Sequence, residues 1–161
     1  MATTAKSRRK QADPAPLDEV GLEAWRTFIA VNSRLMRELD EELRQEHGYS
    51  LGDYDVLIQL SRGPSEGLRM CDLANAVLLS PSGLSRRVER LERSGFVQRD
   101  RASSDGRSIE ARLTTAGKRL VRRLGTAHLA GVKERFADQF SNRELEAIRD
   151  LLGRLETADG C

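Results

Sequence analysis

The stretch from Ser80 to Arg107 reads SPSGLSRRVERLERSGFVQRDRASSDGR. Ser80 suits the cap before a helix, Pro81 suits the first helical position, and Gly95 suits the position just after the last turn. The segment between these signals is rich in arginine. It therefore predicts a short basic helix that ends at a glycine stop.

A helical wheel of this segment separates an apolar side from a polar one. Leu84, Val88 and Leu91 fall together, and we expect that side to be buried. The opposite side combines small residues with arginines that can bind guanine edges or phosphates. The residues of this helix predicted to contact DNA are Ser80, Ser82, Gly83, Ser85, Arg86 and Arg90. The alternative is an ordinary surface helix with solvated arginines.

A basic β-hairpin is predicted directly after this helix. Residues 96–99 and Ile109–Leu113 have the pattern of half-buried strands, and the Asp105-Gly106 pair between them is a turn signal. Arg107 at the tip is predicted to enter a narrow minor groove. Asp105 would hold an arginine in place, or serve only as the turn former. The hairpin residues predicted to contact DNA are Arg99, Asp105 and Arg107.

The segment before the basic helix completes the pattern. Residues 68–77 begin like a strand and continue as a short helix with Leu73, Ala74 and Val77 directed inward. Two helices joined by a short turn and followed by a hairpin form a winged helix-turn-helix. The predicted fold class is mainly α (α+β), with a two-stranded wing and helices at both ends of the chain.

From Leu17 to Leu155 the chain resembles the multiple antibiotic resistance regulator (MarR) family of bacterial repressors. The resemblance is carried by LERSGFV at 91–97, Asp105-Gly106-Arg107, and LTTAG at 113–117. It implies that the Asp-x-Arg tip belongs to the wing and that LTTAG opens the long helix after it. It also implies a homodimer and a cleft for small aromatic or phenolic acids.

Charge is distributed unevenly along the 161 residues. The net charge is only +2, yet residues 80–123 hold twelve basic against five acidic residues, whereas residues 18–47 hold four against eight. A basic middle beside an acidic flank is typical of a face that binds duplex DNA.

The two ends of the chain carry apolar stripes that a winged domain alone cannot bury. These stripes lie at helical spacing in residues 22–45, 115–140 and 141–155, with glycines at 125 and 131 that favour a bend or a close helix crossing. We expect them to form a dimerisation region through Leu145, Ile148, Leu152 and Leu155. The alternative is a monomer whose helices fold back on its own wing domain.

Four segments follow from this pattern. Residues 1–16 form a basic tail without apolar periodicity, which we expect to be disordered. Residues 17–48 form an N-terminal dimerisation helix, residues 50–114 the DNA-binding domain, and residues 115–157 the C-terminal dimerisation helices.

The cleft that the resemblance implies would bind a small-molecule effector. Its predicted lining residues are Trp25, Phe28, Met36, Tyr54 and Arg87, the last of which would pair with a carboxylate. The alternative for the aromatic residues is core packing.

The sequence offers no support for catalysis, a cofactor or a metal site. His47 and His128 are isolated, and the two cysteines, Cys71 and Cys161, have no ligand-like partners. We expect Cys71 to be an ordinary, partly buried cysteine; the alternative is a reactive thiol at a helix start. Since no signal peptide or apolar membrane span is found, we expect a cytoplasmic protein without membrane contact.

These patterns together predict a homodimeric, sequence-specific transcriptional regulator, a repressor released by a small ligand. Its partners would be a pseudo-palindromic duplex and a second copy of itself. The alternative is a winged-helix protein-interaction module without sequence-specific DNA binding.

Overall fold

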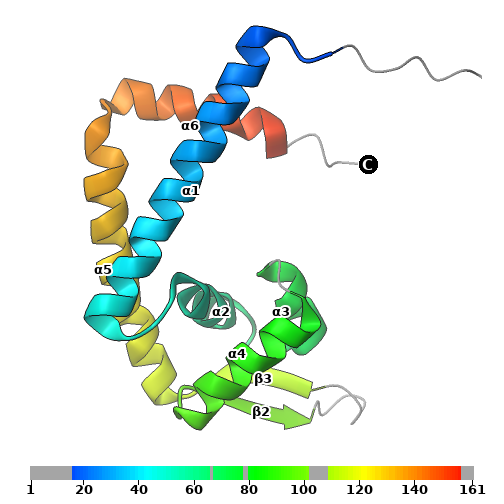
Figure 1. Ribbon diagram of the computed structural model, residues 1–161. Coiled ribbons are helices and arrows are strands. Elements are labelled where there is room, and N and C mark those ends of the chain that lie inside the picture. The colour runs from blue at the N-terminus through cyan, green and yellow to red at the C-terminus, as the bar shows by residue number, and fades with distance from the viewer. Residues whose placement is uncertain (1–15, 66, 78–79, 102–108, 157–161) are drawn as a thin grey trace, which may run out of the picture. The chain divides into compact units, whose positions relative to one another are not determined.

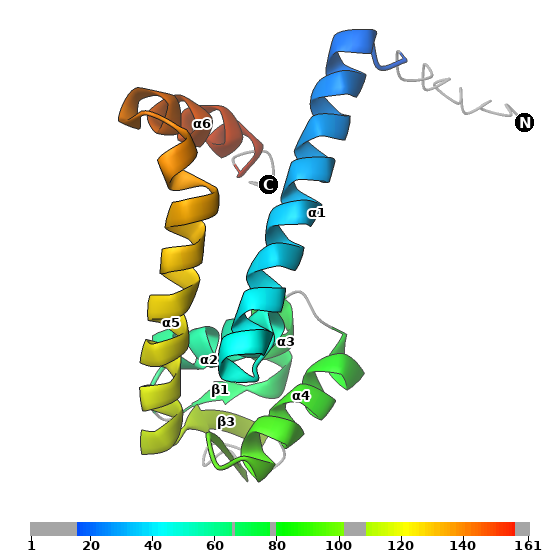
Figure 2. The same ribbon diagram turned by 60° about the vertical axis from the view of Figure 1, so that its left-hand side comes forward.

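The computed structural model describes residues 16–65, 67–77, 80–101 and 109–156 (Figures 1 and 2). The described elements are α1 (Glu19–His47), α2 (Leu51–Arg62), β1 (Leu68–Arg69), α3 (Met70–Ala76), α4 (Pro81–Arg93), β2 (Val97–Arg101), β3 (Ile109–Leu113), α5 (Thr115–Arg135), a 3-10 turn η1 (Ala137–Gln139) and α6 (Asn142–Glu156). This order is that of a winged helix-turn-helix between terminal helices, so the predicted fold class is confirmed. Within the described ranges, no helix is both long and apolar enough to span a membrane.

The chain divides into two compact units at a point inside α1, between Arg34 and Leu35. The first unit contains the N-terminal part of α1. This helix begins where the Asp18 carboxylate accepts a hydrogen bond from the Gly21 amide at 2.7 Å. Trp25 and Phe28 lie on this part with ring centroids 6.2 Å apart, and both side chains are exposed.

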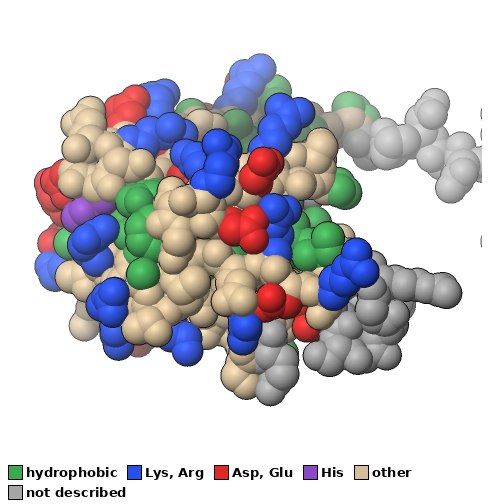
Figure 3. Space-filling view, turned by 90° about the horizontal axis from the view of Figure 1, so that it is seen from below, with side chains coloured by type: hydrophobic (Ala, Val, Ile, Leu, Met, Phe, Trp, Pro, Cys, Tyr) green, Lys and Arg blue, Asp and Glu red, His purple; other side chains and the backbone are tan. Residues whose placement is uncertain are grey.

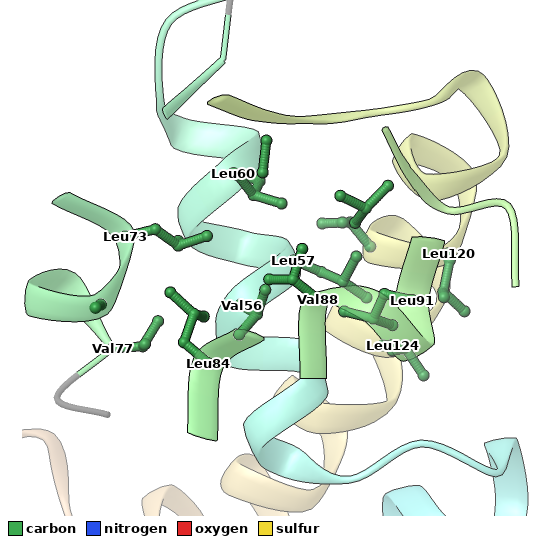
Figure 4. Close-up of a cluster of buried hydrophobic side chains, with 14 of the residues drawn as sticks. Val56, Leu57, Leu60, Leu73, Val77, Leu84, Val88, Leu91, Leu120 and Leu124 are labelled. Carbon is green, nitrogen blue, oxygen red and sulfur yellow. The ribbon is translucent and has the colours of Figure 1, made fainter. Parts of the chain in front are cut away.

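The second unit contains a core to which α2, α3, α4, α5 and the C-terminal part of α1 contribute buried side chains (Figure 4). Leu57 of α2, Leu73 of α3 and Leu124 of α5 are fully buried. Burying one such side chain stabilises the fold by roughly 1.5–3 kcal/mol. The six residues predicted to face inward are all buried: Leu73, Ala74, Val77, Leu84, Val88 and Leu91.

A three-stranded antiparallel sheet, in the order β1-β3-β2, completes this unit. Val97 pairs with Leu113 and Arg101 with Ile109, so β2 and β3 pair along their full length. β3 has its predicted bounds, but β2 begins one residue later than predicted. Phe96 precedes the strand, and its carbonyl accepts from the Thr114 amide at 3.0 Å. The predicted wing tip, with Asp105 and Arg107, lies outside the described residues.

α5 crosses the C-terminal part of α1 closely at Gly131. A Cβ there would lie 2.9 Å from Cδ2 of Leu39, so the close crossing predicted from this glycine is confirmed. Arg135 pairs with Glu42 at 2.8 Å on the same crossing. These contacts join the end of α1 to the far half of α5.

α5 ends at Arg135, five residues before the predicted end of the helical pattern. The backbone of Phe136 leaves helical geometry at φ −125°, and one 3-10 turn follows. The rings of Phe136 and Phe140 then meet edge to face, with centroids 5.4 Å apart. In the sequence, the apolar pattern continues past Arg135 because Phe136 and Phe140 are apolar. In the structure, however, their rings pack against each other and do not extend the apolar stripe of a helix.

α6 begins after Ser141, as predicted. The Glu144 carboxylate accepts from the Ser141 amide at 2.8 Å and from its hydroxyl at 2.7 Å, which fixes the first turn. The apolar stripe of α6 stays accessible: Leu152 is 43% and Leu155 is 66% exposed.

Candidate nucleic-acid interface

The basic helix α4 is built as its sequence predicts. The Ser80 hydroxyl accepts from the Gly83 amide at 3.2 Å, and Pro81 fills the first helical position. Leu84, Val88 and Leu91 anchor one side in the core. The small residues and most of the arginines are therefore held on the outer side, where Ser82, Ser85 and Arg86 are exposed.

Arg86 is the arginine of α4 that is best placed to bind a ligand outside the protein. Its side chain is exposed, and no ion pair joins it to any carboxylate in the described part of the chain. Figure 3 views the molecule from the end where α4 and the sheet lie, and Lys and Arg side chains are spread over much of that face. Arg86 is thus an exposed cation of α4 without a carboxylate partner among the described residues.

Arg87 and Arg90 have a different environment, since both contact Asp53 of α2. Asp53 is fully buried and accepts from the amide and hydroxyl of Ser50 at 2.9 and 2.8 Å. Arg87 Nη1 reaches the same carboxylate at 3.1 Å, and Arg90 Nη2 pairs with it as well. This ion cluster ties the start of α2 to the middle of α4 and fixes how α4 is rotated about its axis.

The charge of Asp53 is maintained by these contacts. Burial alone would raise the pKa of the carboxyl, but the hydrogen bonds from Ser50 and the Arg90 guanidinium outweigh it and leave the pKa below its ordinary value. Asp53 therefore stays ionised at neutral pH, which a buried carboxylate does only when it is paired.

A second ion pair joins the end of α4 to the wing. Glu92 accepts from the Arg99 guanidinium at 2.5 and 2.8 Å and from the Arg99 amide at 3.3 Å. Across the hairpin, Arg112 pairs with Asp100 at 2.9 Å. The direction of the wing relative to α4 is thereby set by charged contacts at its base.

The start of α5 is fixed to the same place. Thr114 caps α5 by accepting from the Gly117 amide at 3.0 Å, and its hydroxyl donates to the Gly95 carbonyl at 2.7 Å. Gly95 has φ +76°, which favours glycine, and Gly117 leaves no room for a side chain because a Cβ would lie 2.1 Å from the Phe96 carbonyl oxygen. The end of α4, the base of the wing and the first turn of α5 thus form one junction.

The predicted DNA-contacting residues fall into three groups. Those on the outer side of α4 lie together, as expected: Ser80, Ser82, Gly83, Ser85 and Arg86. Arg90 and Arg99 are engaged in ion pairs, with Asp53 and Glu92 respectively. Asp105 and Arg107 lie outside the described residues. All of these contacts stay predictions.

The predicted ligand residues lie in both units. Trp25 and Phe28 belong to the first unit, while Met36 is exposed on the second. The Tyr54 ring lies against His128, with centroids 5.1 Å apart, and burial lowers the pKa of His128 despite the opposing charge of Glu42. Arg87 is paired with Asp53.

Two features of this region were missed from the sequence. Ser50 and Asp53 form a capping box that the spacing of a serine and a carboxylate could have revealed. Asp53 also pairs with Arg87 and Arg90, which lie 34 and 37 residues further along the chain. No local sequence signal predicts these two contacts. Cys71 was predicted to be partly buried, and this was wrong: it is exposed, with its Sγ 3.6 Å from Asp72 Oδ1.

Comparisons with known proteins agree with this geometry. A family model described as the MarR family matches residues 47–108. AbsC, a MarR family transcriptional regulator from Streptomyces coelicolor, is 32% identical, with a TM-score of 0.80 over 90% of this chain and 97% of AbsC. Sco3205, a MarR family regulator from the same organism solved in complex with DNA, is 28% identical, with a TM-score of 0.83 over 92% of each chain. The transcriptional regulator PecS of Dickeya dadantii is 28% identical over 152 residues, which cover 94% of this chain and 87% of PecS.

Proposed function

Because this chain belongs to the MarR family of transcriptional regulators, we propose that it represses transcription by binding a pseudo-palindromic operator as a homodimer. A small ligand releases it from the DNA. The DNA-binding part of this proposal agrees with the relative Sco3205, which was solved with DNA bound. Repression follows physically, since a dimer that covers its operator excludes other proteins from the same stretch of duplex.

The observation that carries the proposal is the outer side of α4. Small residues at its N-terminal end, Ser82 and Gly83, permit close approach to base edges, and the free amides of the first turn favour a phosphate. Arg86, exposed and without an ion pair among the described residues, binds a guanine edge. Arg90 and Arg99 face backbone phosphates while they keep Asp53 and Glu92 as partners. Arg107 occupies the flanking minor groove, with Asp105 beside it.

The apolar stripe of α6 supports the dimer. Leu145 and Ile148 are half-buried, whereas Leu152 and Leu155 are exposed in the single chain. An exposed apolar stripe of this kind is typical of a surface that another protein surface covers. A second copy of the chain covers it symmetrically and holds two α4 helices at one separation, as a twofold operator requires.

For the effector we propose a small aromatic or phenolic acid. Within the second unit, Tyr54 supplies a ring contact and Met36 is an adaptable apolar side chain. The buried Nε of Arg87 has no hydrogen-bond partner among the described residues. This guanidinium therefore keeps a donor for an incoming carboxylate even while Asp53 holds its Nη1.

A titration against operator DNA in the presence of competitor tests the proposal. Operators are first selected from random duplexes, and binding is then measured at several salt concentrations with excess unrelated DNA. The proposed function predicts affinity that survives the competitor. Weak, uniform binding that salt abolishes would instead favour a winged-helix protein-interaction module.

A further inference from the structure

The first half of α5 carries a basic surface that the contacts of α4 and the wing do not use. Lys118, Arg119, Arg122 and Arg123 are all exposed, and we call them the α5 basic face. They lie on the side of the helix opposite Leu120, Val121 and Leu124, which are buried in the core. No ion pair joins any of the four to a carboxylate of the described residues.

This arrangement is unfavourable for the isolated helix. Residues 118 and 122, and residues 119 and 123, are like charges at the spacing where helical side chains meet, and such pairs repel. Lys118 and Arg119 also lie near the positive end of the helix dipole, and the first turn of α5 contains no acidic residue to offset them. Local stability therefore does not account for the α5 basic face, whereas a polyanionic partner would.

The position of the face points to one such partner. Thr114 and Gly117 fix the first turn of α5 to Gly95 and Phe96, at the end of α4 and the base of the wing. The cations follow within roughly 6–14 Å along the helix axis, at a rise of 1.5 Å per residue. Figures 1 and 2 both place this end of α5 beside the sheet. The α5 basic face thus begins at the same junction that positions the proposed base-reading helix.

We infer that the α5 basic face binds the phosphate backbone of duplex DNA flanking the operator, outside the base pairs contacted by α4 and the wing. This inference rests on the proposed function. The contact is electrostatic and carries no base sequence, so it adds affinity to any flank. Four cations on one helix face, none of them paired with a carboxylate in the described part of the chain, are complementary to successive phosphates.

The test compares two duplexes with the full-length protein. One duplex ends at the edge of the selected operator, and the other continues for about one further helical turn of random sequence at each end. Wild-type protein should bind the longer duplex more tightly and with a steeper dependence on salt. The double substitution Arg119→Gln/Arg123→Gln should reduce that gain without changing binding to the short duplex, since two of the four cations are removed. The slope of log Kobs against log salt should fall in magnitude by up to about 1.8 per engaged subunit, since each lost phosphate contact accounts for about 0.9.

The control is Arg143→Gln/Arg154→Gln, which removes the same charge from exposed positions of α6 opposite its apolar stripe. It should keep the full gain from the flanks. Glutamine preserves helix propensity, so the α5 variant should unfold at the wild-type temperature or above it.

Three results would overturn the inference. The wild-type protein would bind both duplexes equally well, the α5 variant would keep the full gain from the flanks, or the control would lose that gain to the same extent as the α5 variant. A variant that keeps the gain would indicate that the α5 basic face binds an acidic protein instead of DNA. Loss of preference for the operator over competitor in the wild-type protein would overturn the proposed function itself.

Discussion

Arg86 and Arg90 lie one helical turn apart on α4, yet their surroundings assign them different tasks. Arg86 has no carboxylate partner among the described residues, while Arg90 contributes to the buried cluster around Asp53. A free arginine can give its whole hydrogen-bonding capacity to a base edge. An arginine bound to a buried carboxylate supports the structure first and reaches DNA second.

This difference predicts opposite outcomes for two alanine substitutions. Arg86→Ala should leave the free energy of unfolding unchanged and cost roughly 1–3 kcal/mol of binding at one base pair of the operator. Arg90→Ala should lower the free energy of unfolding, because Asp53 loses a charged partner. Urea denaturation and titrations against single-base variants of the operator measure the two effects. Equal loss of stability in both variants would contradict the distinction.

Asp53 should make the stability of the protein depend on pH. Because its folded-state pKa lies below the ordinary value of 3.8, its contribution to stability is complete above that value and is lost as the pH falls through the lower folded-state pKa. Asp53→Asn should therefore destabilise the protein at pH 7, by about 1.5–3 kcal/mol for the lost charged hydrogen bonds. The difference in the free energy of unfolding between the wild-type protein and Asp53→Asn should decrease below pH 3.8.

Asp55→Asn on the same helix is the matched control for this measurement, since it removes one negative charge outside the cluster. Urea denaturation at neutral and acidic pH should show little change for the control. A gap between wild type and Asp53→Asn that stayed constant down to acidic pH would show that ionisation of Asp53 does not stabilise the fold.

At the scale of elements, helix ends were predictable because their signals are local. Ser80 and Ser141 cap α4 and α6 as their sequences indicate, and the buried side of α4 follows from its apolar spacing. The ion pairs of Asp53 and Glu92 were not predictable, since they join segments whose proximity only the fold creates. The break after Arg135 was missed for a related reason. An apolar residue such as Phe136 fits a helical pattern whether it packs along the helix or against a neighbour such as Phe140.

The junction between α4, the wing and α5 makes Gly117 sensitive to substitution. Gly117→Ala places a methyl group 2.1 Å from the Phe96 carbonyl oxygen, so the backbone must shift. The expected cost is roughly 1–3 kcal/mol of unfolding free energy. Gly153→Ala in α6 meets nothing within 4 Å and should instead stabilise the protein by about 0.5–1 kcal/mol. Denaturation of both variants checks this, and a neutral Gly117→Ala would mean that α5 is not seated against Phe96.

At the scale of the whole molecule, the proposed dimer depends on the stripe of α6. Ile148→Asp/Leu152→Asp would bury two carboxylates without partners in the interface, at a cost on the order of several kcal/mol. Dimers should dissociate, and operator affinity should collapse because one half-site offers too few contacts. The winged domain should stay folded, since its core lies in other elements. Sedimentation and a binding titration measure both effects, and a variant that stayed dimeric with normal affinity would place the stripe outside the interface.

The central claim is that two copies of α4 read one duplex symmetrically, and selection of bound sites from random duplexes tests it most directly. Two recognition helices related by a twofold axis should recover a pseudo-palindrome whose half-site centres lie about 10–10.5 bp apart, or a multiple of that spacing. Recovery of a single asymmetric site, bound by one copy of the chain, would contradict both the dimer and the assigned mode of DNA recognition.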